Sequence, residues 1–268
     1  MEMAVLEGKV AIVTGASSGI GRAIALRYGR EGAIVHLADV NVDGGEETAA
    51  MIREAGGQAS FAQCDVSDPE QVHGTIDRAA AESGRLDIIV NNAGVGGTGQ
   101  PVGDMPVEDF QRVIGINLLG PFYGAKFAIP HLRQAGGGSI INIASTYGLI
   151  GAPKTPAYAS AKGGLVMLTK QMAVDYSREN IRVNAICPGF VDTDLGGRRA
   201  KMSPEDAARA LDAREARAAI QPIGRQAHPD EMAGAAVFLA SDDASFVVGT
   251  VLAVDGGQTI LHNWGEYV

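Results

Sequence analysis

The amino-acid sequence predicts a single α/β domain, a doubly wound and mostly parallel sheet of seven strands with helices on both faces. Short runs of β-branched and other apolar residues alternate with segments of helical periodicity along almost all 268 residues. A glycine-rich turn joins the first apolar run to the first helical segment. No internal repeat, linker or low-complexity stretch divides the chain. We therefore expect one domain over residues 1–268.

The first strand, the first helix and the turn between them form a pattern that can hold phosphate groups. The run at 10–13 leads into TGASSGIG at 14–21, and a helical pattern follows. Gly15 permits a tight turn, and Gly19 and Gly21 let a diphosphate approach backbone N–H groups at the positive end of the helix. Such a loop can also merely turn the chain, but its place between strand and helix favours nucleotide binding.

The second strand, expected at 33–39, ends in Asp39. A carboxylate at this position can accept both ribose hydroxyls of an adenosine and would repel a 2′-phosphate. The neighbouring Ser18 and Val40 are not basic, so the pattern favours NAD over NADP. The alternative role for Asp39 is to cap the helix that follows.

The rest of the chain continues the alternation of short β-branched runs with helices bounded by glycine, proline or capping residues. We expect the further strands at 59–64, 86–90, 139–144, 181–186 and 251–254. We expect helices at 42–55, from the capping box at 67–70 to about 83, over most of 107–132, from near Tyr158, from 203 to about 220 and at 230–239.

Two strand ends and one buried amide carry further candidate residues. Asp65 and Val66 follow the third strand, where the carboxylate can meet an adenine amino group. NNAG at 91–94 follows the fourth strand and either lines a cofactor or only holds the strand end. Asn117 lies in an apolar segment, and Pro121 frees a backbone carbonyl one turn earlier. Either these two hold a water on a proton path, or the amide stabilises a helix kink.

The chemistry of the chain centres on Ser145, Tyr158 and Lys162. Tyr158 and Lys162 are four residues apart, so they share one face of a helix. An ammonium beside a phenol favours the phenolate and lowers the pKa of the phenol towards that of a useful general acid or base. Ser145 ends the fifth strand, and a short loop can return its hydroxyl to the phenol to stabilise a developing oxyanion. Taken alone, the Tyr–Lys pair is also typical of an exposed helix face.

The stretch at about 194–225 interrupts the alternation, as substrate lids do. From Leu195 to Arg225 it holds seven basic residues against four acidic ones, which would favour an anionic substrate, although solvated helix faces explain the charge more readily. The basic residues are Arg198, Arg199, Lys201, Arg209, Arg214, Arg217 and Arg225.

Composition argues against several classes of protein. Hydrophobic residues make up 46% and charged residues 20%, as in globular domains, and the net charge of −9 argues against a nucleic-acid partner. No signal peptide or membrane span is apparent, so we expect a cytoplasmic protein with no membrane partner. Cys64 and Cys187 have no C-x-x-C spacing and no histidine pattern accompanies them, so we expect no metal. Two separate buried thiols are favoured over a disulfide.

Together these motifs resemble the short-chain dehydrogenase/reductase family over about residues 8–257. TGASSGIG, Asp65-Val66, NNAG, Asn117, Ser145, YASAK and PGFVDT occur in the family's order and spacing. The resemblance implies hydride transfer at a nicotinamide, with Tyr158 exchanging the proton and Ser145 positioning the substrate oxygen. It also implies that Lys162 holds the nicotinamide ribose and that Asn117 keeps a relay water.

The resemblance further implies a set of cofactor contacts and an assembly. The contacts are Gly15, Ser17, Ser18, Gly19, Ile20, Gly21, Asp39, Asp65, Val66, Asn91, Ala93, Gly94, Tyr158, Lys162, Pro188, Gly189, Val191 and Thr193. Of these, Thr193 would meet the nicotinamide carboxamide. A homotetramer is implied too, which agrees with a helix after Tyr158 that is apolar on more than one side. The tail at 258–268 extends past the usual end of the family, and we expect it to contact a neighbouring subunit.

We therefore expect an NAD-dependent oxidoreductase that transfers a hydride between nicotinamide and a secondary alcohol or ketone. The apolar residues Tyr147, Leu149, Ile150 and Phe190 suggest an alicyclic, aromatic or aliphatic substrate. One alternative is a reductase of 3-oxoacyl thioesters of acyl carrier protein or CoA. Asp39 argues against it, because such enzymes more often use NADPH. A less expected alternative is a non-catalytic NAD-binding sensor, which has no need of the Tyr–Lys pair.

Overall fold

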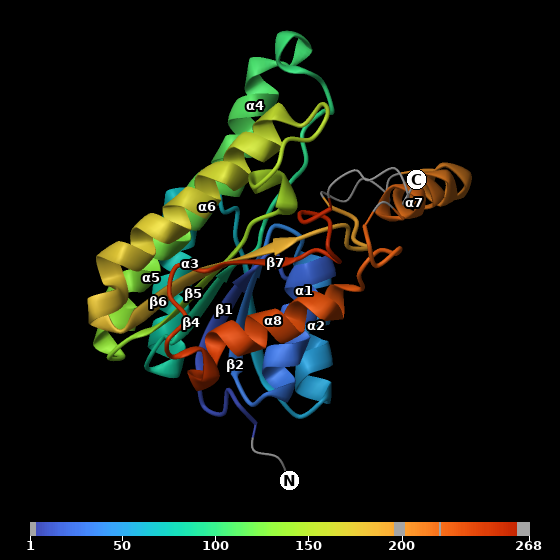
Figure 1. Ribbon diagram of the computed structural model, residues 1–268. Coiled ribbons are helices and arrows are strands. Elements are labelled where there is room, and N and C mark those ends of the chain that lie inside the picture. Colours follow the sequence, from blue (N-terminus) through green and yellow to red (C-terminus); the bar gives the residue numbers. More distant parts are fainter. Residues whose placement is uncertain (1–3, 196–201, 220, 262–268) are drawn as a thin grey trace.

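The structure, a computed structural model, describes residues 4–195, 202–219 and 221–261 (Figure 1). Within these residues, seven strands form one parallel sheet in the order β3-β2-β1-β4-β5-β6-β7, so the predicted single α/β domain is confirmed. The strands are β1 (Val10–Thr14), β2 (Ile34–Asp39), β3 (Gln58–Gln63), β4 (Ile88–Asn91), β5 (Gly138–Ile143), β6 (Ile181–Pro188) and β7 (Val251–Val254).

Helices cover both faces of this sheet (Figure 1). Those on one face are α1 (Gly19–Arg30), α2 (Val42–Glu54) and α8 (Pro229–Ala240). Those on the other are α3 (Pro69–Ser83), α5 (Gly120–Gln134) and α6 (Pro156–Tyr176). The helix α4 (Val107–Ile114) packs on α6 and is joined to α5 by a π-helical turn, Gly115–Leu119, and α7 (Pro204–Ala218) stands away from the sheet (Figure 1).

The central strands are buried on both faces, which is why their sequences are continuous apolar runs. All five residues of β1 are buried. Because side chains alternate along a strand, Val13 packs with α1 and α8 while Ile12 packs with α3 and α5. The strand order reverses between β1 and β4, and ligands of such sheets bind in the crevice at the carboxyl ends of these strands. The glycine-rich loop and NNAG follow these two strand ends.

Two capping predictions need correction. The N-cap of α3 is Asp68, whose carboxylate accepts hydrogen bonds from the N–H groups of Glu70 and Gln71, and not Ser67. The N-cap of α2 is Asn41, so the alternative role of Asp39 as a helix cap is wrong. In each helix the cap is a carboxylate or amide one or two residues after the predicted one, and sequence spacing does not resolve this difference.

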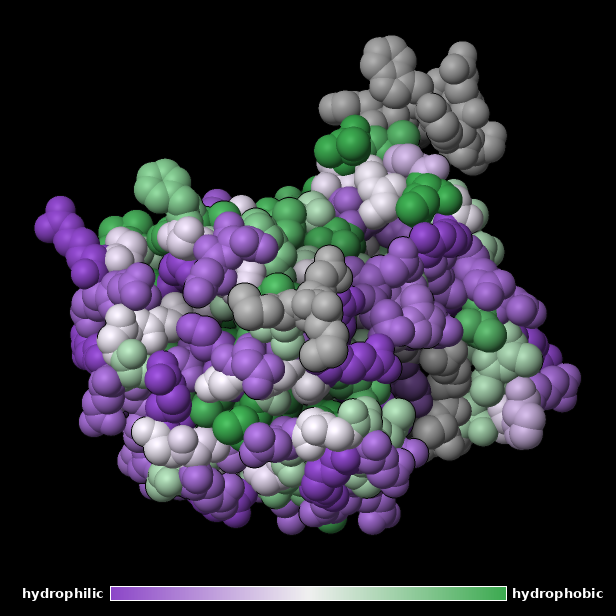
Figure 2. All heavy atoms as spheres, turned by 90° about the horizontal axis from the view of Figure 1, so that it is seen from below, coloured by the Kyte–Doolittle hydropathy of each residue, from purple (hydrophilic) through white to green (hydrophobic). Residues whose placement is uncertain are grey.

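The two cysteines are separate buried thiols, as favoured from the sequence. Cys64 packs with α3 and α5, whereas Cys187 packs with α6. On the face shown in Figure 2 hydrophilic side chains predominate, with apolar ones scattered among them. Among the described residues, no helix combines the length and apolar character needed to cross a bilayer.

Candidate active site

The glycine-rich loop lies at the carboxyl end of β1 and opens α1. Gly15 and Gly19 have φ angles of +66° and +55°, a region that side chains with a Cβ rarely adopt. A Cβ on Gly21 would lie 2.1 Å from the Gly15 carbonyl oxygen. The packing of helix against loop therefore requires a glycine at position 21, and the approach of a diphosphate to Gly21 stays a prediction. The half-buried side chain of Ile20 also packs into the core beside α1.

The first turn of α1 can accept an anion. Its N-cap, Ser18, is extended and exposed, and within the described residues its side chain makes no capping hydrogen bond. The first N–H groups of a helix have no partner inside the helix, and they carry its positive dipole end. Together with the close turn at Gly15, this arrangement forms a cradle that suits a phosphate.

The Asp39 carboxylate lies against this cradle. One of its oxygens, Oδ2, accepts a hydrogen bond from the Ser17 N–H (2.9 Å), and Oδ1 accepts one from the Asn41 N–H (2.9 Å). A carboxylate offers about four acceptor positions, so each oxygen can still accept a hydroxyl. The half-buried Asp39 is thus held in place by two backbone N–H groups and keeps free acceptor positions on both oxygens.

A nearby cation, Arg22, is already engaged. Its guanidinium donates to the carbonyls of Ser17 (2.6 Å) and Gly44 (3.2 Å) and pairs with the Glu47 carboxylate. The guanidinium of Arg22 is therefore paired with a carboxylate within the protein.

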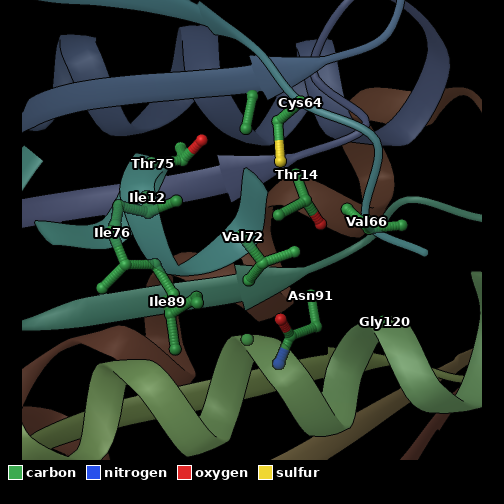
Figure 3. A pocket seen from close by; sticks show the side chains of 12 residues that line it. Ile12, Thr14, Cys64, Val66, Val72, Thr75, Ile76, Ile89, Asn91 and Gly120 are labelled. Carbon is green, nitrogen blue, oxygen red and sulfur yellow. The ribbon is translucent and has the colours of Figure 1, made fainter. Parts of the chain in front are cut away.

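The amides that follow β4 point in opposite directions. Asn91 is buried and donates to the Asn142 Oδ1 (2.9 Å), and a Cβ on Gly124 would lie 2.2 Å from its Oδ1. Its side chain therefore faces α5 (Figure 3), which agrees with the structural role left open from the sequence, and its contact with a cofactor stays a prediction. The side chain that reaches the crevice is Asn92, which donates to the carbonyls of Thr14 (2.9 Å) and Gly15 (3.1 Å). The alternation of side chains along a strand is the signal that identifies it.

A small apolar cavity of about 10 Å³ lies beneath the crevice (Figure 3). Cys64, Val66 and Asn91 are among its lining residues. This volume is about that of one water molecule, so the cavity cannot hold a cofactor. The Val66 side chain belongs to this interior, and a Cβ on Gly120 would lie 3.0 Å from its Cγ2. Asp65, half-buried, accepts from the Ser67 N–H (2.9 Å) and hydroxyl (2.7 Å).

The structure brings Ser145, Tyr158 and Lys162 together. Ser145 follows β5, and its Oγ accepts a hydrogen bond from the Tyr147 N–H (3.1 Å). The Ser145 hydroxyl also lies close enough to the Tyr158 hydroxyl to favour its ionised form. The turn after Ser145 approaches α6 so closely that a Cβ on Gly148 would lie 2.7 Å from the Lys162 carbonyl oxygen. Gly148 thus permits the contact between strand end and helix.

Lys162 is buried, and its ammonium donates to the Ile143 carbonyl (2.7 Å). Its Nζ lies 5.8 Å from the centre of the Tyr158 ring. A Cβ on Gly94 would lie 3.7 Å from this Nζ and 3.2 Å from the Asn117 Oδ1, so these three residues share one site. The pair is therefore not the exposed helix-face pair of the alternative interpretation.

The expected direction of the Tyr158 pKa is not the one the structure shows. Burial raises the pKa of Tyr158 above its ordinary value, and the hydrogen bond from Ser145 lowers it only in part. Burial also lowers the pKa of Lys162 to about 8. Removing both charged forms from water opposes their ionisation, and this is the largest effect on the pKa of each group.

Asn117 lies in the π-helical turn and is fully buried. Its Nδ2 donates to the Val95 carbonyl (2.8 Å), and its Oδ1 accepts from the Val95 N–H (2.8 Å). The amide thus holds the loop that carries Gly94, a third role beside the two open from sequence. π-helical turns are frequent at functional sites.

An aromatic wall lies next to the phenol. The ring of Tyr147 meets those of Tyr158 and Phe190 edge to face, with 6.4 Å between centroids in both cases. Leu149 and Ile150, which continue this loop, are 41% and 39% exposed. Of these four apolar residues, Tyr147 contacts Tyr158 directly and Phe190 contacts Tyr147, and the role of all four in facing the substrate stays a prediction.

The segment after β6 lies opposite the glycine-rich loop. The methyl group of Thr193 lies 3.1 Å from the position that a Cβ on Gly19 would occupy. Gly189 donates its N–H to the Val254 carbonyl (3.1 Å), and the N–H of Phe190 donates to the buried Gln221 (2.8 Å). Gln221 is a site residue that sequence reasoning missed.

The basic residues of the expected lid have partners within the protein where they are described. Arg209 pairs with Glu205 and Asp206 of its own helix, and Arg225 pairs with Glu231. Arg214 donates to backbone carbonyls of Val191 and Thr193. Arg198, Arg199 and Lys201 lie outside the described residues, as do residues 262–268 of the tail. The side chain of Arg217 is likewise not described.

Comparison with known proteins agrees with this geometry. The family profile described as "Enoyl-(Acyl carrier protein) reductase" matches residues 15–259. Cis-4-hydroxycyclohexanecarboxylate dehydrogenase of Sinomonas cyclohexanicum is 44% identical over 94% of this chain and 96% of its own length. Cyclopentanol dehydrogenase of Comamonas sp. (strain NCIMB 9872) is 42% identical over 94% and 97%.

A solved structure has the same fold. The crystal structure of a short-chain type dehydrogenase/reductase from Mycobacterium marinum matches with a TM-score of 0.87 and 37% sequence identity. The match covers 97% of this chain and 99% of that one.

Proposed function

The chain belongs to the short-chain dehydrogenase/reductase family, and from this membership we propose that it is an NAD-dependent oxidoreductase acting on a secondary alcohol or the matching ketone. The observation that carries the proposal is the Ser145 hydroxyl beside the Tyr158 phenol, with the Nζ of the buried Lys162 5.8 Å from the phenol ring centre. This group lies at the same edge of the sheet as the phosphate cradle. Proton transfer and hydride transfer can therefore occur side by side.

The crevice residues fit a nicotinamide dinucleotide. The left-handed turn at Gly15 and the first turn of α1 suit its diphosphate, and Asp39 suits its adenosine ribose. Lys162, Gly94 and Thr193 would border its nicotinamide end. When bound, the nicotinamide accepts or donates the hydride. The charge of Asp39, with Arg22 neutralised by Glu47, supports NAD over NADP.

The side chains of the site have different roles in the proton transfer. During alcohol oxidation the Tyr158 oxygen takes the hydroxyl proton, and during ketone reduction it returns one. The Ser145 hydroxyl donates a hydrogen bond to the substrate oxygen, whose negative charge grows during the reaction. Lys162, with a pKa of about 8, is mostly charged at neutral pH and favours the phenolate. Asn117 holds the Gly94 loop beside Lys162 through its two bonds to Val95.

The aromatic wall supports a ring-shaped apolar substrate. Tyr147 and Phe190 present ring faces and edges next to the phenol, and flat apolar groups pack well against them. Two relatives carry names of ring alcohol dehydrogenases, for cyclopentanol and for 4-hydroxycyclohexanecarboxylate. We propose an alicyclic secondary alcohol as the substrate class.

A 3-oxoacyl thioester reductase is the second candidate, because the family profile is described by an acyl-carrier-protein substrate. An acidic carrier would need basic side chains that are free to pair with it. Among the basic lid residues whose side chains the structure describes, Arg209, Arg214 and Arg225 are engaged within the protein. Activity with a 3-oxoacyl thioester and NADPH that exceeds activity with cyclic alcohols would favour this candidate.

We also propose a homotetramer in the cytoplasm. Exposed apolar side chains concentrate on the surfaces of α4, α5 and α6 and the turn between the first two. They are Val107, Phe110, Leu119, Phe122, Met167 and Val174. Met167 and Val174 project from the helix after Tyr158 that the sequence marked as apolar on several sides. Two buried free thiols support a reducing compartment. Light scattering at micromolar concentration measures the assembly, and a monomer would contradict it.

The test of the function is NADH formation with cyclopentanol, 4-hydroxycyclohexanecarboxylate and acyclic alcohols. We expect turnover of the cyclic alcohols, and Tyr158→Phe should lower kcat by about 10²- to 10⁴-fold because the proton acceptor is lost. NADH binding, followed by fluorescence, should change little. Tyr147→Phe, which keeps the neighbouring ring, is the matched control and should stay within about tenfold of wild type. Full turnover by Tyr158→Phe would remove the proposed proton transfer.

A further inference from the structure

The segment from Pro188 to Thr193 forms one side of the crevice, and its backbone hydrogen bonds leave the sheet. β6 pairs with β7 up to Pro188, and Gly189 still donates to the Val254 carbonyl (3.1 Å). Beyond this point a short parallel bridge joins Val191 to Ala227. An extended segment outside a sheet needs other partners to keep its position.

Arg214 of α7 supplies two of these partners. Its Nη2 donates to the Val191 carbonyl (2.8 Å), and its Nη1 donates to the Thr193 carbonyl. Carbonyls two residues apart in an extended chain point to the same side, and a guanidinium carries donors in a rigid fork. The half-buried Arg214 thus bridges both carbonyls with one side chain.

Gln221 supplies the partner on the other side of the segment. Only 3% of it is exposed. Its Oε1 accepts from the Phe190 N–H (2.8 Å), and its Nε2 donates to the Arg225 carbonyl (2.7 Å). A Cβ on Gly189 would lie 2.3 Å from the Gln221 Oε1, so a glycine is required for this approach.

The residues held in this way contact both parts of the proposed site. Thr193 packs against Gly19 of the phosphate cradle. Phe190 packs edge to face on Tyr147, which in turn packs on Tyr158. The position of Pro188–Thr193 therefore influences the distance between the phosphate cradle and the aromatic wall.

Arg209, also on α7, does not donate to the carbonyls of this segment in the part of the chain that the structure describes and so serves as a comparison with Arg214. It lies on the same helix as Arg214, is exposed, and pairs with Glu205 (3.6 Å) and Asp206 (3.1 Å) one turn away. These pairs stay within α7. Replacing Arg209 therefore removes a positive charge from α7 without removing a hydrogen bond to the crevice segment, whereas replacing Arg214 removes both.

We propose that Arg214 and Gln221 are positioning residues for the reaction. This pair, the Arg214–Gln221 clamp, holds Phe190–Thr193 so that cofactor and substrate bind next to Tyr158. The proposal rests on the proposed function for its kinetic consequence, but the clamp itself is a property of the backbone. In this proposal α7 holds the crevice segment in position, and its arginines do not serve to attract an anionic substrate.

The test compares the full-length wild type with Arg214→Ala, Arg214→Lys and Arg209→Ala. Hydrogen exchange of peptides covering 188–194 should be about tenfold faster in Arg214→Ala, because two carbonyls lose a charged donor. The KM for NAD and the Kd for NADH should rise about tenfold, with kcat within about threefold. In Arg214→Lys, whose ammonium reaches one carbonyl more easily than two, the exchange rate, KM and Kd should lie between those of wild type and Arg214→Ala. Arg209→Ala should match wild type in every measurement.

The outcomes separate the clamp from the function. Unchanged exchange at 188–194 in Arg214→Ala, or the same change in Arg209→Ala, would overturn the clamp. A loss of kcat and thermal stability with unchanged KM and exchange would also overturn it, because general destabilisation removes active enzyme without altering affinity. Wild type that neither binds NADH nor oxidises an alcohol would contradict the proposed function, while the exchange comparison would still decide on the clamp.

Discussion

At the scale of single residues, burial is the main influence on the chemistry of the site. Tyr158 has a raised pKa and Lys162 a lowered one, since each loses water around its charged form. The Ser145 hydrogen bond acts in the opposite direction on Tyr158, because it stabilises the phenolate. Ser145 therefore makes the phenol more acidic than burial alone would leave it.

Asp39 offers a test at this scale. Its carboxylate should repel a 2′-phosphate, so Asp39→Ala should raise the ratio of kcat/KM for NADPH over NADH by about tenfold or more. Asp39→Asn keeps an oxygen that can accept the Ser17 N–H but loses the charge, and it should show most of the same change. Steady-state kinetics with both cofactors measure the ratio. A wild-type preference for NADPH would contradict the assigned role.

At the scale of elements, close backbone contacts decide where glycine is required. Gly21 touches the Gly15 carbonyl, and Gly148 touches the backbone of α6. Both contacts hold a loop of the site against a helix. In contrast, Gly74 lies in the exposed part of α3 with open space around it.

This difference predicts opposite effects of the same substitution. Gly74→Ala should stabilise the protein by about 0.5–1 kcal/mol, because alanine loses less backbone entropy in a helix. Gly21→Ala should destabilise it by about 1–3 kcal/mol, since the new methyl group overlaps a backbone oxygen. It should also weaken NADH binding. Thermal unfolding measures both, and equal effects of the two changes would contradict the contact at Gly21.

At the scale of the whole molecule, the parallel sheet collects the site from distant parts of the chain. The loop after β1, the end of β2, the loops after β4, β5 and β6, and the helix α6 all meet at one edge. This edge is the usual ligand position in such sheets. The cost of the arrangement is a lysine buried within the fold.

Lys162 links the stability of the whole protein to pH. Its pKa of about 8 lies below that of an unfolded lysine, about 10.4, so between these values the unfolded chain binds more protons. The penalty for burying the charge is complete below pH 8 and is relieved as pH rises towards 10. Relative to Lys162→Met, wild type should therefore gain stability over this range.

Denaturant unfolding at several pH values measures that difference. Below about pH 8 the gap between wild type and Lys162→Met should be constant. Lys170→Met, on an exposed position of the same helix, is the matched control and should show no such dependence. If wild type instead lost stability relative to Lys162→Met as the pH rises from 8 to 10, the lowered pKa of Lys162 would be contradicted.

Much of the fold and the site was predictable because its signals are local. The seven strands, the helices between them and the glycine-rich loop follow from short-range patterns of β-branched residues, helical spacing and glycine. The proximity of Ser145, Tyr158 and Lys162 follows from a strand, a short loop and one helical turn. Their assignment to catalysis stays a prediction.

The errors came from quantities that depend on neighbours distant in sequence. The sequence by itself determined the order of elements and the residues at the crevice, since backbone propensities and side-chain periods act over a few residues. Only the tertiary structure decided that Asn117 binds the backbone of Val95, that Arg214 donates to the carbonyls of Val191 and Thr193, and that burial raises the pKa of Tyr158. Desolvation and hydrogen-bond partners are properties of the packed whole, and no local pattern encodes them.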